Sequence, residues 1–151
     1  MADNRFKDFI SFAIEKEIEA ASLYEKYAEI VQSRGTRKML LELAEMERNH
    51  ERRLREVAKG NWEEFGTPQP LMDLKIADYM VSAPLGQDST VEDAMAFAMK
   101  AEQKAYALYT KLAELETDSN TRKLFADLAS EELGHKHNLE SEYEQMIMGE
   151  N

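Results

Sequence analysis

The chain contains an internal repeat, and this repeat limits the possible folds more than any other feature of its 151 residues. Residues 12–54 align without a gap with residues 97–139, at a constant offset of 85 positions. In this alignment 17 of 43 pairs are identical, including the tripeptide Thr-Arg-Lys at 36–38 and 121–123. Each half of the chain is therefore expected to build the same supersecondary unit.

Each repeat has the hydrophobic spacing of two amphipathic helices. In the first repeat, apolar residues recur every three or four positions from Phe6 to Val31, through Ala13 and Ala20, and again from Leu40 to Val57. The second repeat shows the same spacing from Val91 to Leu112 and from Phe125 to Met146. This spacing is typical of helices that bury one face, so we expect four long helices.

The breaks between the two helices of each repeat are short, at residues 33–35 and 118–120. Short breaks favour antiparallel neighbours, so the sequence predicts two helical hairpins, over about residues 3–58 and 90–147. Thr90, followed three residues later by Asp93, predicts a capping box where the third helix begins.

A long connection, residues 60–89, separates the two hairpins and holds all three prolines and half of the six glycines. It is long enough to return along a helix of about 25 residues, which spans about 37 Å. A short helix is possible within it, at Leu71–Val81. The sequence therefore predicts an all-α fold, an antiparallel four-helix bundle with one long crossover, as a single domain over residues 1–151.

Composition excludes several classes of function. The chain has no cysteine, which removes disulfides, thiolate zinc sites, iron–sulfur clusters and cysteine nucleophiles. With 19 Lys+Arg against 30 Asp+Glu, its net charge is −11, which argues against nucleic acid and anionic membranes as partners. The first dozen residues lack a signal-peptide apolar stretch, and the longest apolar run, Ala94–Met99, is too short to span a bilayer. We expect a cytoplasmic protein.

Six polar residues interrupt the apolar faces at matching positions of the two repeats. They are Glu17, Glu47 and His50 in the first repeat and Glu102, Glu132 and His135 in the second. Each continues the three-and-four spacing of its buried face; Glu47 and His50, for example, lie between Leu43 and Leu54. Four carboxylates and two imidazoles are therefore expected to point into the core at one level.

A core with four carboxylates requires positive charge. Desolvation opposes the charged form of each carboxylate, and like charges a few ångströms apart repel each other. Two divalent cations would neutralise four carboxylates. Because Glu and His three residues apart share a helix face, each Glu-x-x-His pair can bind one ion, and a donor set of carboxylates and imidazole suits iron or manganese.

The motifs Glu17-x-x-Ala20-x-x-x-Tyr24 with Glu47-x-x-His50, and Glu102-x-x-Ala105-x-x-x-Tyr109 with Glu132-x-x-His135, resemble the rubrerythrin branch of the ferritin-like superfamily. The resemblance covers residues 5 to about 147. It implies a ferritin-like bundle that holds two iron ions per chain, with manganese or a mixed pair as alternatives.

The resemblance also implies roles for individual residues. Glu47 and Glu132 would bridge the two metal ions. The shell of one ion would be completed by Glu17 and His50, and that of the other by Glu102 and His135. The side chains of Tyr24 and Tyr109 would orient the carboxylates by hydrogen bonding; the alternative for both tyrosines is plain core packing. The third histidine, His137, is expected at the surface.

By the same resemblance, the reduced metal pair would react with hydrogen peroxide or O₂ in oxidative-stress defence. Electrons would come from an external donor protein, and the chain would form a homodimer. Two features depart from rubrerythrins proper. The cysteine-rich rubredoxin domain is missing, and Ala105 stands where that family carries an additional Glu that assists peroxide chemistry.

Two other functions remain open from the sequence. The first is iron handling or ferroxidase-type storage, which would require a hollow assembly. The second is a metal-free structural bundle, in which the six polar residues form a hydrogen-bonded network and the acidic surface meets another protein. A rise in melting temperature on adding Fe(II) would separate metal binding from the metal-free alternative.

Overall fold

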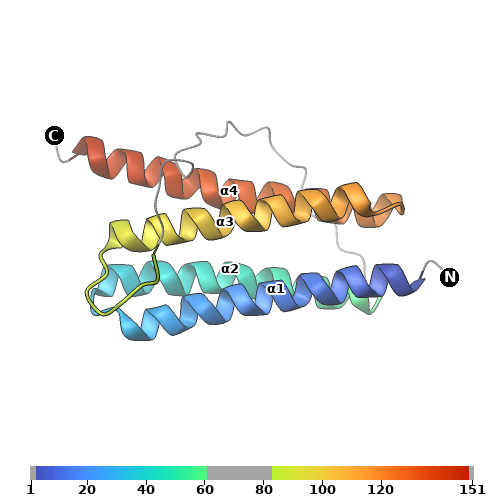
Figure 1. Cartoon of the computed structure of the whole chain (residues 1–151), viewed down its shortest axis with the longest axis horizontal. Helices are drawn as coiled ribbons and strands as arrows, with labels where there is room; N and C mark the ends of the chain where they lie inside the picture. Colours follow the sequence, from blue (N-terminus) through green and yellow to red (C-terminus); the bar gives the residue numbers. More distant parts are fainter. Residues whose placement is uncertain (1–2, 61–82, 150–151) are drawn as a thin grey trace. The chain divides into compact units, whose positions relative to one another are not determined.

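The protein was analysed as a computed structural model that describes residues 3–60 and 83–149, with side chains described for residues 8–60 and 83–146. These residues form four helices and no strand (Figure 1): α1 (Asp3–Ile30), α2 (Arg34–Ala58), α3 (Val91–Leu115) and α4 (Ser119–Gly149). The predicted short helix at residues 71–81 lies outside the described residues.

The helices form two antiparallel hairpins, as the sequence predicts. Helices α1 and α2 make one compact unit, which also contains residues 86–88, and α3 and α4 belong to a second. The backbone amide of Gln32 donates to the carbonyl of Gln87 over 3.3 Å, which ties residues 86–88 to the α1–α2 turn. The single-domain organisation over the whole chain stays a prediction.

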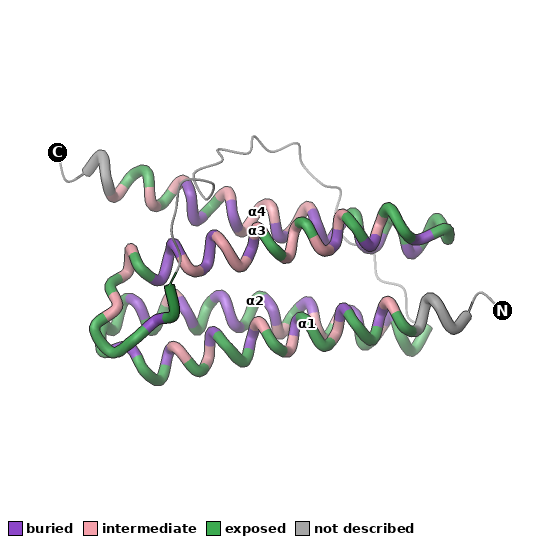
Figure 2. The backbone as a smooth tube through the Cα atoms, in the orientation of Figure 1, coloured by how far each residue is buried: buried purple, intermediate pink, exposed green. Residues whose placement is uncertain are grey.

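The buried residues of α1 follow the predicted stripe with one correction. Ile10, Ala13 and Tyr24 are buried, as expected. The prediction placed Ala20 on this stripe, but the structure buries Ala21 completely and leaves Ala20 half-buried. At 100° per residue the two positions are neighbours on the helix, and the packing of α1 against α2 decides which of them faces the core. Figure 2 shows how buried and exposed positions alternate along all four helices.

The α1–α2 turn is held by the Ser-x-x-Thr-Arg sequence at its centre. The hydroxyl of Ser33, the N-cap residue of α2, accepts a hydrogen bond of 3.3 Å from the backbone amide of Thr36. The guanidinium of Arg37 donates to the carbonyls of Ala28 and Val31 over 3.1 and 3.0 Å. Because the last carbonyls of a helix lack intrahelical donors, Arg37 satisfies two groups at the end of α1.

The α3–α4 turn repeats this arrangement at the offset of 85 residues. Asp118 replaces Ser33, and its Oδ2 accepts the backbone amide and the hydroxyl of Thr121 over 3.0 and 2.8 Å. These bonds, the backbone one first, lower the pKa of Asp118. Arg122 donates from Nε and Nη2 to the carbonyl of Glu116. The repeated Thr-Arg dipeptide therefore closes both hairpins.

The predicted capping box at the start of α3 is confirmed. The backbone amide of Thr90 donates to Oδ2 of Asp93 over 2.9 Å, and the amide of Asp93 donates to the Thr90 hydroxyl over 3.1 Å. None of the described helices combines the length and the apolar character that crossing a bilayer requires.

Candidate metal centre

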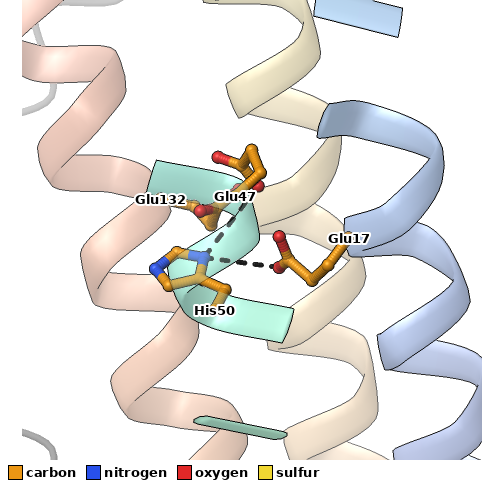
Figure 3. Close-up of side chains that lie close together, drawn as sticks. All are labelled: Glu17, Glu47, His50 and Glu132. Atoms are coloured by element: carbon orange, nitrogen blue, oxygen red, sulfur yellow. Dashed lines mark ion pairs between the residues drawn. The ribbon is translucent and has the colours of Figure 1, made fainter. Parts of the chain in front are cut away.

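The first hairpin brings together three of the predicted ligands, Glu17 from α1 and Glu47 and His50 from α2. Nδ1 of His50 lies 3.4 Å from Oε1 of Glu17 and 3.9 Å from Oε2 of Glu47, as the dashed lines in Figure 3 show. One ligand atom from each of the three residues lies within 4.8 Å of the others. We call these residues triad 1.

The second hairpin repeats the arrangement with Glu102 from α3 and Glu132 and His135 from α4, which we call triad 2. Nδ1 of His135 lies 3.6 Å from Oε2 of Glu102 and 3.5 Å from Oε1 of Glu132. The three residues again offer ligand atoms within 4.8 Å of one another. The structure therefore brings the six predicted residues together as two groups of three, each within its own hairpin.

Local helix geometry explains how each triad forms. Glu47 and His50 are three residues apart on α2, so their side chains leave the same face. Glu17 lies on the buried stripe of α1, one turn after Ala13 and one turn before Ala21. Because α1 and α2 are antiparallel and joined by a short turn, these two faces meet, and the equivalent faces of α3 and α4 meet in the same way.

The carboxylates of both triads are buried. Glu17, Glu47, Glu102 and Glu132 are each at most 2% exposed. Two carboxylates close together and removed from water destabilise each other when both are ionised. A protonated imidazole offsets part of this charge, whereas a divalent cation offsets the charge of two carboxylates.

The donor set of each triad fits a metal ion. Carboxylate and imidazole ligands lie about 2.0–2.2 Å from a metal such as zinc, so two ligand atoms at right angles are about 3 Å apart, and wider angles separate them further. The observed separations of 3.4 to 3.9 Å in triad 1 therefore lie close to those of ligands that share one ion. Oxygen and imidazole donors without sulfur favour iron or manganese over metals that require thiolates.

Tyr24 and Tyr109, the predicted orienting residues, are both buried at 1% exposure. The ring of Tyr109 stacks against Phe125 of α4, with centroids 6.2 Å apart and an angle of 26° between the planes. Stacking accounts for the position of that ring. The role of the two hydroxyls toward the carboxylates stays a prediction.

Two further sequence expectations concern residues near the triads. Ala20 and Ala105 hold equivalent positions and are both half-buried. His137 was expected at the surface, but its side chain is only partly exposed.

A buried ion pair beside triad 2 was not predicted from the sequence. Nζ of Lys136, the residue after His135, lies 3.2 Å from Oε2 of Glu140, and both residues are at most 1% exposed. In the first hairpin the equivalent positions carry Glu51 and Arg55, whose side chains pair over 2.9 Å. Opposite charges four residues apart, in reversed order in the two repeats, were the sequence signal that could have revealed both pairs.

A charged bridge between α1 and α2 was also missed. The guanidinium of Arg48 donates to Glu25 over 2.8 Å and to the hydroxyl of Ser22 over 3.3 Å, both on α1, and to Glu51 over 3.0 Å on its own helix. Hydrogen bonds to Glu25 first and Glu51 second raise the pKa of Arg48. Burial opposes ionisation of Glu51, but the bonds from Arg48 and Arg55 outweigh it and lower the pKa of Glu51.

Known proteins resemble the chain in sequence and in fold. The sequence matches the family model described as Rubrerythrin over residues 8–143. Among solved structures, a hypothetical protein from Pyrococcus furiosus is 28% identical, with a TM-score of 0.62 over 97% of this chain and 93% of that chain. Curated proteins give no significant match.

These similarities confirm the predicted fold class, an all-α, ferritin-like four-helix bundle. Since the family match spans most of the chain, the protein belongs to the rubrerythrin family.

Proposed function

We propose that this chain is a non-haem di-iron oxidoreductase that reacts with hydrogen peroxide or O₂. One observation carries the proposal: two hairpins related by the repeat each converge two buried carboxylates on Nδ1 of one imidazole. Four buried carboxylates without a cation would repel one another, which favours metal over a metal-free polar network. Membership of the rubrerythrin family supports the same reading.

In this proposal each triad supplies ligands to one ion. Glu17 and His50 would hold the first ion, and Glu102 and His135 the second. Glu47 and Glu132 would be shared between the two ions. When bound, the iron pair would supply electron transfer through the ferrous and ferric states. Manganese, or one ion of each kind, fits the same donors.

The side chains have two tasks around the ions. Their four carboxylates neutralise two divalent cations, which leaves the buried site without net charge in the reduced state. Their burial keeps bulk water away, so the interaction between each carboxylate and a cation is stronger than it would be at the surface. Tyr24 and Tyr109 are proposed to fix the orientation of the carboxylates by hydrogen bonding.

The proposal includes an external electron donor protein, because reduction of an oxidant consumes electrons and the chain has no cysteine to hold a rubredoxin-type iron site. A homodimer in the cytoplasm is the setting we propose. Storage of iron is the competing function, and it differs in requiring a hollow assembly that keeps many more than two ions per chain.

The first test is to load the metal-free protein with Fe(II) without oxygen, remove the excess and count the iron that remains. We expect two ions per chain. Peroxide or O₂ is then added in separate samples, and the faster oxidation, followed by absorbance, identifies the preferred oxidant. An iron count near zero, with manganese also failing to bind, would refute the proposal.

The Glu47→Ala variant tests the bridging role. We expect it to lose both ions while keeping its helical circular dichroism, because the lost carboxylate serves both ions. Glu42→Ala is the matched control, since Glu42 is on the same helix but exposed; it should bind two ions. A Glu47→Ala protein that keeps the pair would refute the assignment of Glu47 as a bridge.

A further inference from the structure

The two triads differ in their access to solvent, and we infer that triad 2 is the side on which the metal pair exchanges with solution. The inference rests on the proposed function, because it concerns the same six ligands. It adds that the ion bound by Glu102 and His135 enters last and leaves first, while the ion bound by Glu17 and His50 is retained.

Side-chain exposure is the first observation. The His135 side chain is 16% exposed, whereas that of His50 is 2% exposed. The carboxylate side chains do not differ in this way: those of Glu17 and Glu47 are 3% and 2% exposed, and those of Glu102 and Glu132 are 1% and 0% exposed. Among the six side chains, that of His135 is therefore the most exposed, although its Nδ1, like that of His50, is buried.

The flank of each hairpin gives a second observation. On the second hairpin, an open groove of about 560 Å³ runs between α3 and α4. It is lined mainly by small or short side chains: Tyr106, Thr110, Ala113, Glu114, Arg122, Ala126, Ala129 and Ser130. The groove extends from Arg122, near the turn, to Tyr106 and Ser130, which are four residues after Glu102 and two residues before Glu132, so it ends next to triad 2.

At one position equivalent to the groove, the first hairpin has a charged bridge between α1 and α2. Thr110 corresponds to Glu25, which binds Arg48 across the two helices. Arg48 itself corresponds to Leu133, which has no charge with which to form such a bridge. A cavity of about 480 Å³ on the first hairpin is lined by residues of α2 alone, and three of them, Arg37, Leu41 and Glu45, are equivalent to Arg122, Ala126 and Ser130 of the groove.

The neighbours of the two imidazoles along the helix differ as well. Gly134 precedes His135, whereas Asn49 precedes His50. Glycine inside a helix is about 1 kcal/mol less favourable than alanine, so its use here needs a compensating reason. The glycine is therefore a further difference in sequence between the two triads.

Chemical modification of the metal-free protein tests the difference in access. A limited amount of diethyl pyrocarbonate is added at neutral pH, and modified histidines are located by peptide mass spectrometry. The chain has only three histidines, and we expect His135 and the partly exposed His137 to react before His50. Modification of His50 at the same rate as His135, or earlier, would refute the inference.

The rate of metal release tests whether the two ions leave the protein at different rates. Protein loaded with Co(II), which binds oxygen and imidazole donors and stays divalent in air, is mixed with an excess of a chromogenic chelator. We expect two phases of one ion per chain each, separated by at least about tenfold in rate. His135→Ala should retain the slow ion alone, and His50→Ala the fast ion alone.

The outcomes separate this inference from the proposed function. If no Co(II) binds and metal does not protect either histidine from modification, the proposed metal site fails. If two ions bind but leave together, or if His50→Ala retains the slow ion, the metal site stands and the inequality of the triads is refuted. If either variant fails to bind metal, the order of histidine modification in the unmutated protein still tests whether triad 2 is more accessible than triad 1.

Discussion

Thr36 and Thr121 occupy the same position of the two repeats and are both buried, yet their hydroxyls differ in hydrogen bonding. The Thr121 hydroxyl donates to Asp118 over 2.8 Å. Ser33 takes the place of Asp118 in the first hairpin, and among the described residues the Thr36 hydroxyl has no hydrogen-bond partner. The Ser33 hydroxyl accepts the backbone amide of Thr36, whereas Oδ2 of Asp118 accepts both the backbone amide and the hydroxyl of Thr121.

This difference predicts opposite effects of one substitution. Thr121→Val should destabilise the protein by about 1 kcal/mol, because it removes a hydrogen bond and leaves the site otherwise unchanged in shape. Thr36→Val should be neutral or stabilising, because it removes a buried hydroxyl that gains nothing in the folded state. Urea unfolding of both variants measures their free energies of unfolding. Equal losses would contradict the difference in hydrogen bonding between the two hydroxyls.

At the scale of elements, the two hairpins share their turns and their triads but differ in how their outer flanks are held. A charged bridge from Arg48 to Glu25 links α1 to α2. At the equivalent positions of the second hairpin, Thr110 and Leu133 carry no charge. The Lys136–Glu140 pair of the second hairpin lies within α4 and is buried, so salt screens it less, and the stability of the first hairpin should depend more on salt.

Arg48→Met tests the bridge. We expect a loss of about 0.5–1 kcal/mol at pH 7 and low salt, with a smaller loss at high salt. Because the pKa of Glu51 is lowered, ionised Glu51 stabilises the folded state at pH values above the ordinary carboxyl range. This stabilisation is lost as the pH falls through the lowered pKa. The loss caused by Arg48→Met should therefore shrink in acid.

The measurement is urea unfolding at pH 7 and near pH 3, with Lys38→Met as the matched control. Lys38 is on the same helix, its side chain is 81% exposed, and its nearest carboxylate, on Glu42, is 4.0 Å away. An effect of Arg48→Met that is the same at both pH values would show that the bridge does not act through charge.

At the scale of the whole molecule, the proposed metal binding would be coupled to folding. The carboxylates of the triads are buried only in the folded chain, so a cation that binds them stabilises the native state by mass action. At a free concentration one hundred times its dissociation constant, each ion would contribute about 2.7 kcal/mol.

We therefore expect Fe(II), added without oxygen, or Mn(II) to raise the melting temperature by several degrees. Magnesium, which prefers oxygen ligands and retains its water, should have a much smaller effect and is the control. Scanning calorimetry measures the shift, and the sedimentation coefficient of the same sample gives the size of the assembly. No shift with either metal would favour the metal-free bundle, and a large hollow shell would favour storage.

The sequence by itself determined the helices, the hairpins and the six polar residues on the buried faces. These follow from the spacing of residues along one helix, which is a local property: the steps from Leu43 through Glu47 and His50 to Leu54 place all four on one face whatever lies opposite. The repeat made the prediction stronger, since it gave the same pattern twice.

Only the tertiary structure decided how each face is used. Whether Ala20 or Ala21 faces the core depends on the packing of α1 against α2, because the two positions are 100° apart. The same holds for the bridge from Arg48 to Glu25, and for the exposure of His135 relative to His50. Such features depend on which side chain of a neighbouring helix comes within a few ångströms, and spacing along a single helix does not contain that information.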